Sequence, residues 1–388
     1  MLLQSNAAVV LTGPRQIGKT TLSLEVTEEM NAIYRDLENP RELEQVQDIE
    51  LFTKQYPDRL IILDEVQRVP DIFAPLRGII DQRRRAGLRT GQFLFLGSSS
   101  LELLGQASES LAGRVAYAEL AGLNILEIQA TENMTISPDD LWVKGGFPES
   151  LIAADYTTSQ QWRRDLIRSY LERDIPQFGF RIPSETMRRF WTMLAHHQSG
   201  VLNASSLAGS LGISGQSVAR YLDILVDLLL VRRLQPWFAN VGKRLVKSPK
   251  VYIRDSGLLH TLLDIPSMDA LLSHPVLGAS WEGFVIENLI GTNSRDYGEP
   301  YFYRTQAGAE IDLLMTCGGQ PEIAIEVKRA SNPKVGKGFH IACDDLGIEH
   351  RYVVYPGDEA YALPNGLWAM PLHEMIVTLQ SRQGYSFS

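Results

Sequence analysis

Residues 13–20 read Gly-Pro-Arg-Gln-Ile-Gly-Lys-Thr and match the phosphate-binding pattern G-x-x-x-x-G-K-[ST]. The apolar run 7–11 before them has the length of a buried strand, and residues 21–26 after them open a helical pattern. Strand, glycine-rich loop and helix in this order are the context in which such a loop (a P-loop) binds a nucleotide. The sequence therefore predicts a nucleotide site near the start of the chain.

The chemistry of a polyphosphate explains the spacing within this loop. Gly13 and Gly18 let backbone N–H groups curl around an oxygen-rich anion at a helix N-terminus. We expect Lys19 to reach the β- and γ-phosphates and the Thr20 hydroxyl to hold Mg²⁺. The residues expected to contact the nucleotide are Gly13, Pro14, Arg15, Gln16, Ile17, Gly18, Lys19, Thr20 and Thr21.

A second apolar stretch, 60–63, ends in Asp64 and Glu65. Asp64 would hold Mg²⁺ through water, and Glu65 would polarise the water that attacks the γ-phosphate. Two acids after a strand are also typical of an exposed loop, but a P-loop earlier in the chain favours the catalytic interpretation. The cofactors expected from both motifs are ATP and Mg²⁺.

Further strands are expected at 32–38, 93–96 and 115–119, separated by helical stretches. This alternation predicts a parallel sheet with helices on both faces, and ligands then bind at the carboxyl ends of its strands. The strand at 93–96 runs into Gly-Ser-Ser-Ser at 97–100, where a hydroxyl could sense the γ-phosphate.

Composition limits the remaining possibilities. A chain of 388 residues with 44% hydrophobic and 21% charged residues is expected to form two or three globular domains. With no apolar run of membrane-spanning length, no signal sequence and only two cysteines, we expect a cytoplasmic protein without disulfides or a zinc site. A net charge of −9 argues against indiscriminate nucleic-acid binding by the whole molecule, although a local basic surface remains compatible with it.

The middle of the chain is expected to be helical from about residue 139 to 189, as a lid and connector. Residues 203–225 then read as helix, turn and helix, and residues 231–237 and 250–254 as a two-stranded wing. From 185 to 255 the sequence has ten Lys or Arg and four Asp or Glu, and four of the bases crowd the wing: Lys243, Arg244, Lys247 and Lys250. DNA contact and protein docking both fit this segment.

The last third contains a second set of chemically active residue types. Two strands are expected at 309–315 and 322–328, and alternation puts Glu326 and Lys328 on one face of the second. Asp312 and Glu326 would bind Mg²⁺ and orient water at a phosphodiester, while Lys328 would stabilise the charge that develops there. A helix at 281–288 offers a third acid. Glu282 and Glu287 lie about 140° apart around a helix, and we favour Glu282.

Two family resemblances follow from these motifs. The stretches LTGPRQIGKTTL, LIILDEVQRVP, LFLGSSSLELL, ESLAGRV and WVKGGFPES resemble a group of bacterial and archaeal AAA-type ATPases whose C-terminal domain has an uncertain function. The resemblance implies that Ser98 or Ser99 senses the γ-phosphate and that Arg114 lies near the nucleotide or a neighbouring subunit. The D…E-x-K arrangement resembles the PD-(D/E)xK nuclease superfamily, with Ile311 where proline is usual. An inactive nucleic-acid-binding relative would look similar.

Together these features predict an α/β protein: an AAA-type P-loop parallel sheet, a helical lid, a winged helix and a restriction-endonuclease-like α/β domain. The expected boundaries are 1–135, 136–184, 185–255 and 256–388. The function expected is Mg²⁺-dependent ATP hydrolysis coupled to a nucleic-acid transaction, with DNA cleavage as one form of it. The alternatives are an ATP-driven switch that docks a protein partner and a DNA-binding regulator with an inactive nuclease-like domain. The sequence predicts no membrane contact and leaves the oligomeric state open.

Overall fold

The computed structural model describes residues 2–98, 111–130, 136–177, 182–238, 242–292 and 297–381, with Pro70, Ser98 and Gln177 described by their backbone alone. The chain forms two compact units. The first comprises Met1–Ala121 with Asp227–Leu229, and the second comprises Gly122–Val226 with Leu230–Ser388. The expected boundaries at residues 184 and 255 fall inside the second unit and stay predictions.

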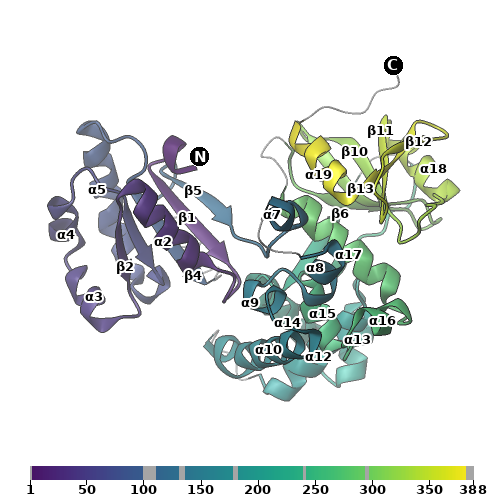
Figure 1. Ribbon diagram of the computed structural model, residues 1–388, viewed down its shortest axis with the longest axis horizontal. Helices are drawn as coiled ribbons and strands as arrows, with labels where there is room; N and C mark the ends of the chain where they lie inside the picture. The colour runs from purple at the N-terminus through teal and green to yellow at the C-terminus, as the bar shows by residue number, and fades with distance from the viewer. Residues whose placement is uncertain are drawn as a thin grey trace. The chain divides into compact units, whose positions relative to one another are not determined.

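The first unit contains the expected parallel sheet (Figure 1). In the described part of the chain it has five strands in the order β2-β3-β4-β1-β5, and every adjacent pair is parallel. The strands are β1 (Ala8–Gly13), β2 (Ile33–Asp36), β3 (Ile61–Asp64), β4 (Phe93–Ser98) and β5 (Val115–Glu119). The carboxyl ends of β1 and β3, which carry the two nucleotide motifs, therefore flank the end of β4.

Apolar side chains on both faces of this sheet hold helices against it, as the alternation along each strand requires. Val9 and Ile62 face a layer that includes residues of α1 (Leu2–Ser5) and α2 (Lys19–Met30). Val10 and Ile61 face the opposite layer. That layer is built by α3 (Pro40–Gln45), α4 (Ile49–Gln55) and α5 (Phe73–Arg85), with the short turns η1 (Val66–Arg68) and η2 (Pro70–Ile72) between β3 and α5.

The second unit begins with helices, as the sequence predicts for residues 139–189. Tyr170–Asp174 continue α10 (Tyr156–Ser169) into α11 (Ile175–Gln177) as a turn of π-helix, a feature that the periodicity did not predict. The helices are α7 (Ile125–Ala130), α8 (Pro138–Lys144), α9 (Pro148–Leu151), α10 (Tyr156–Ser169), η3 (Tyr170–Asp174), α11 (Ile175–Gln177), α12 (Ser184–His196), α13 (Ala204–Leu211), α14 (Gly215–Asp227), α15 (Ser256–Leu262), α16 (Met268–Leu272) and α17 (Leu277–Gly291). None of the helices in the described residues is long and apolar enough to span a membrane.

Helices α13 and α14 form the expected helix-turn-helix outline, but the two strands after them are not a free wing. Strands β6 (Val231–Pro236) and β7 (Lys250–Ile253) pair antiparallel, as expected. Gln235 and Pro236 of β6 also pair in parallel with Tyr301 and Phe302 of the next strand, β8. The expectation of a separate two-stranded wing is therefore wrong, because β6 continues the C-terminal sheet.

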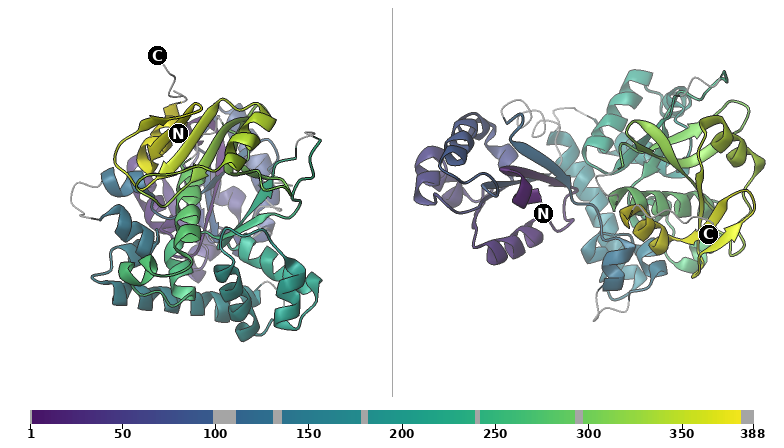
Figure 2. Two further views of the ribbon diagram at one scale, coloured as in Figure 1. Left: turned by 90° about the vertical axis from the view of Figure 1, so that its right-hand side faces the viewer. Right: turned by 90° about the horizontal axis from the view of Figure 1, so that it is seen from above.

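That sheet is mixed, with eight strands in the described residues in the order β12-β13-β11-β10-β9-β8-β6-β7. Helices α18 (Lys337–Leu346) and α19 (Leu372–Ser381) cover its opposite faces, and α17 packs on the same face as α19 (Figures 1 and 2). The remaining strands are β8 (Tyr301–Arg304), β9 (Glu310–Cys317), β10 (Gln320–Val327), β11 (His350–Tyr355), β12 (Tyr361–Leu363) and β13 (Leu367–Pro371).

Candidate nucleotide site and acidic pocket

The P-loop joins β1 to α2 with glycine at the two positions that require it. Gly18 has a φ of +102°, a left-handed conformation that favours glycine at the start of α2. A Cβ at Gly13 would lie 2.6 Å from the carbonyl oxygen of Leu120, so this glycine also permits close packing beside the loop. Lys19 is 7% exposed, and its Nζ donates to the carbonyl oxygens of Gly13 and Pro14, both at 2.9 Å. Burial lowers the pKa of Lys19.

The two expected Mg²⁺-holding residues of this unit lie together. The Thr20 hydroxyl donates to Oδ2 of Asp64 at 2.8 Å, and Asp64 is 3% exposed at the end of β3. The Tyr34 hydroxyl donates to the same oxygen at 2.9 Å. A hydroxyl and a carboxylate are the oxygen ligands that Mg²⁺ prefers, so this pair fits the ion. Sequence reasoning missed Tyr34, although its place on the strand beside β3 could have indicated it.

Glu65 follows Asp64 in a strained conformation beside the loop. Its φ is +53°, which is uncommon for a residue with a side chain. Its backbone N–H donates to Oδ1 of Asp64 at 2.8 Å, and Gln67 donates to its carboxylate. Burial raises the pKa of Glu65, so the group becomes a better proton acceptor than an exposed glutamate.

The two residues implied by resemblance have different outcomes. Arg114 lies at the opposite end of the sheet from the P-loop, since its carbonyl accepts from the N–H of Ala8 while Gly13 ends β1. Its guanidinium binds both oxygens of Asp81 at 2.8 Å. The prediction that Arg114 contacts a nucleotide in its own chain is therefore wrong, because about 16 Å of strand β1 separates Arg114 from the P-loop. A contact with a neighbouring subunit stays a prediction.

The other implied residue is the sensor serine. The backbone of Ser98 pairs with Gly13 at the carboxyl end of β4, beside the P-loop. Its side chain, and all of Ser99, lie outside the described residues. The sensor role therefore stays a prediction.

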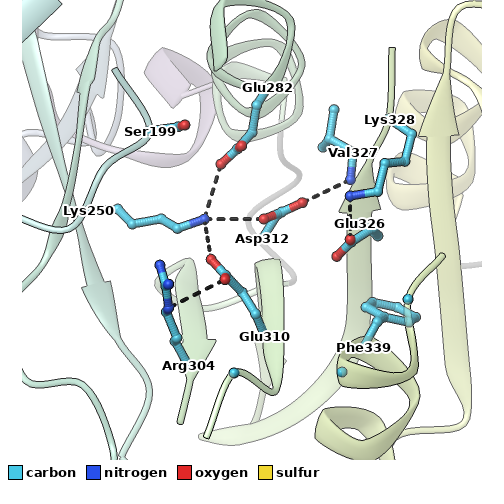
Figure 3. Close-up of a pocket in the computed structure, with 13 residues that line it drawn as sticks. Ser199, Lys250, Glu282, Arg304, Glu310, Asp312, Glu326, Val327, Lys328 and Phe339 are labelled. Carbon is cyan, nitrogen blue, oxygen red and sulfur yellow. Dashed lines mark hydrogen bonds and ion pairs between the residues drawn. The ribbon is translucent and has the colours of Figure 1, made fainter. Parts of the chain in front are cut away.

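In the second unit, the acids expected at the C-terminal site line one pocket of about 590 Å³ (Figure 3). The antiparallel register pairs Ile325 of β10 with Leu313 of β9, so the next positions, Glu326 and Asp312, lie side by side. Glu282 reaches the same pocket from α17. Hairpin pairing and a packed helix thus bring together residues that are far apart in the sequence.

Each strand acid already has a partner. Asp312 accepts from the backbone N–H of Val327 through Oδ2 at 3.1 Å. Glu326 accepts from Nζ of Lys328 at 2.6 Å. Burial, and then the charge of Asp312, raise the pKa of Glu326 to about 8. The same two causes raise the pKa of Glu282 to about 7.

Lys250 corrects the sequence interpretation most strongly. The sequence predicts this residue among the basic residues of a wing, but its side chain is 3% exposed and points into the acidic pocket (Figure 3). Its Nζ lies 3.1 Å from Glu282, 2.8 Å from Glu310 and 3.1 Å from Asp312. Burial disfavours the charge of Lys250, but the neighbouring carboxylates outweigh it and raise its pKa above the usual value. Alternation along β7 could have linked Lys250 with Tyr252, whose hydroxyl donates to Glu282 at 2.8 Å.

The pocket as it stands does not fit a metal ion. Within the described ranges, no three His, Cys, Asp or Glu side chains are placed so that they could hold one. Two of the expected ligands, Glu282 and Asp312, are bonded to Lys250, and the third, Glu326, is bonded to Lys328. Metal binding by these residues stays a prediction.

Two further charged residues of this unit, Glu287 and Lys243, are bound to partners away from the pocket. Glu287 binds Arg232 and, at 3.0 Å, Arg254, so it does not share the position of Glu282. Lys243 pairs with Asp345 at 2.6 Å. Lys243 is exposed, and so are the other two bases before β7, Arg244 and Lys247.

Comparison with known proteins finds three domain models that match successive parts of the chain. An AAA domain matches residues 5–129, which include the P-loop, Asp64 and Glu65. Two domains of unknown function, DUF8612 and DUF4143, match residues 137–269 and 277–375. The uncharacterized proteins Rv2008c of Mycobacterium tuberculosis and Mb2031c of Mycobacterium bovis are each 43% identical over 370 residues, 95% of this chain and 81% of theirs. The chain belongs to their family.

The similar solved structures resemble this chain only weakly. The Orc1 protein of Aeropyrum pernix in complex with DNA is 12% identical, with a TM-score of 0.30 over 68% of this chain and 88% of that one. The RuvB Holliday junction branch migration motor of Thermotoga maritima is 14% identical, with a TM-score of 0.30 over 60% and 86%. Similarities this low support no argument. The family assignment rests on the mycobacterial relatives.

Proposed function

We propose that this AAA-domain protein hydrolyses ATP with Mg²⁺ and couples hydrolysis to a nucleic-acid transaction in which the acidic pocket binds a phosphodiester. The observation that carries the first half is the 2.8 Å hydrogen bond between Thr20 and Asp64. It joins the two motifs expected to share one metal, although they lie on different elements. When bound, Mg²⁺ would neutralise charge on the phosphates.

The residues around this bond have separate roles in the proposal. Lys19 exchanges two backbone carbonyls for phosphate oxygens, which are stronger acceptors because they are charged. Glu65 orients the attacking water and accepts its proton. Tyr34 holds the carboxylate of Asp64 in position through their 2.9 Å bond. Burial and the charge of Asp64 raise the pKa of Tyr34, so this hydroxyl stays a hydrogen-bond donor.

The second half of the proposal rests on the mixture of charges around the acidic pocket. Arg304 and Lys328 line it, and their side chains are 41% and 37% exposed. Both can therefore turn toward a phosphate at the mouth. Asp312 and Glu326 lie side by side in the same pocket, as expected for groups that act on a phosphodiester.

The test of this proposal uses the full chain in two assays. ATP hydrolysis should require Mg²⁺ and should fall in Glu65→Gln while nucleotide binding remains. Plasmid and single-stranded DNA should be cleaved with Mg²⁺ or Mn²⁺, and the rate should change with ATP. A wild-type chain that hydrolyses no ATP would contradict the first half, and one that neither binds nor cleaves DNA would contradict the second.

The position of Lys250 favours a second candidate, a DNA-binding regulator that does not cleave. A lysine already neutralises the carboxylates at which a metal is expected. In this alternative the nucleotide would tune DNA occupancy. Salt-dependent DNA affinity without cleavage at any divalent concentration would support the regulator over the nuclease.

A further inference from the structure

Lys250 has the contacts of an ion bound in the acidic pocket. Its ammonium group has three N–H donors, and three carboxylates lie within 3.1 Å of its nitrogen. They come from α17 (Glu282) and β9 (Glu310 and Asp312). The sequence predicts a divalent ion on Asp312 and Glu326 with Glu282 as a third acid, so Lys250 binds two of the three expected ligands.

The lysine and a divalent ion cannot share this position. An ammonium group about 3 Å from both carboxylates uses the oxygens that a metal would coordinate. Its charge also repels a second cation, and repulsion is strong where little water screens it. The side chain of Lys250 is 3% exposed, so screening there is weak.

We propose that Lys250 is a resident cation of the acidic pocket, and that a divalent ion binds Glu282 and Asp312 only after the ammonium group leaves them. This inference rests on the proposed function of the pocket. It explains why the expected ligands converge on one pocket while no metal site is formed among the described residues. Strand β7, on which Lys250 lies, thereby controls the metal affinity of a pocket built largely on other elements.

The test is a calorimetric titration of Mn²⁺ into the full chain without nucleotide. Asp312→Asn serves as the blank that assigns heat to this pocket. Lys250→Met should bind Mn²⁺ at least tenfold more tightly than wild type. Lys247→Met removes the same charge from the exposed end of the same segment and should stay within twofold of wild type, which controls for the change in net charge.

A measurement on wild type guards against misfolding of Lys250→Met. Amine acylation of Lys250, followed by peptide mass spectrometry, should rise when Mn²⁺ is added, because the displaced side chain becomes accessible. Acylation of Lys247 should not change.

The outcomes separate the two proposals. Wild-type Mn²⁺ binding at the pocket, with equal or weaker binding by Lys250→Met or no rise in acylation, would overturn the role of Lys250 and leave the metal site standing. No Mn²⁺ binding by either protein at millimolar concentration would overturn the metal site itself, and the role of Lys250 with it.

Discussion

The nucleotide site and the acidic pocket each contain a buried lysine, and the partners of that lysine differ. Lys19 donates to two carbonyls of its own loop, five and six residues away in the sequence. Lys250 is bound to Glu282 and Asp312, 32 and 62 residues away. A lysine held by neutral carbonyls can exchange them for a charged phosphate, whereas one held by carboxylates already has its counter-charge. Buried lysines can therefore prepare a site for an anion or occupy the place of a cation.

The largest effect on ATP hydrolysis is expected from a substitution at Glu65, beside the P-loop. Glu65→Gln removes the proton acceptor and keeps the shape of the side chain. We expect the rate of ATP hydrolysis to fall by ~10²–10⁴-fold, the usual contribution of a general base. Nucleotide affinity, measured with a fluorescent ATP analogue, should stay within a few-fold of wild type. Hydrolysis at the wild-type rate would show that another group activates the water.

The next effect compares the two lysines directly. Lys19→Ala removes a donor aimed at the phosphates, and hydrolysis should fall by ~10²–10³-fold with weaker nucleotide binding. Lys250→Ala should leave basal ATP hydrolysis unchanged, because Lys250 belongs to the second unit and binds its carboxylates. Steady-state kinetics on both variants check this. Equal losses in the two would remove the distinction between the lysines.

The acidic pocket should also make stability depend on pH. In the folded chain the pKa of Glu326 is about 8, against ~4.3 for an unfolded glutamate. The folded state thus binds more protons between these values, and the stability gained is lost as pH rises through about 8. Since one pKa unit corresponds to ~1.4 kcal/mol, we expect a fall of more than ~1 kcal/mol between about pH 5 and 8. Urea unfolding should show the fall in wild type and a smaller one in Glu326→Gln.

The smallest effect concerns the basic segment before β7. Arg244→Glu and Lys247→Glu should each flatten the salt dependence of duplex binding by about one unit of slope, since each exposed base can contact one phosphate. Lys243→Glu should change it less, because Asp345 already holds that lysine at 2.6 Å. Fluorescence anisotropy across a salt series measures the slopes. If all three variants showed the same slope as wild type, DNA contact by this segment would be excluded.

The two regions also differ in how far sequence predicted them. The P-loop is encoded within a few consecutive residues, and the strands that bring Asp64 to Thr20 show clear apolar runs, so the first site could be predicted. At the second site, Glu282, Asp312 and Glu326 were recognisable as residue types in suitable elements. The position of Lys250 was not, because it depends on β6 pairing with β8, a long-range contact that local patterns do not encode. Contact of Arg114 with the nucleotide of its own chain was implied by resemblance alone, and the residues around Arg114 do not encode its pairing with Asp81 on another element.

We propose one centre for ATP and another for a phosphodiester. The most direct test of this proposal measures ATP hydrolysis and Mn²⁺-dependent plasmid cleavage on the same preparations of wild type, Lys19→Ala and Asp312→Asn. Asp312→Asn should abolish cleavage and leave basal hydrolysis intact, while Lys19→Ala should abolish hydrolysis and keep the cleavage seen without ATP. A wild-type chain that neither binds nor cleaves the plasmid, or an Asp312→Asn protein that loses hydrolysis together with cleavage, would contradict the proposal of two separate centres.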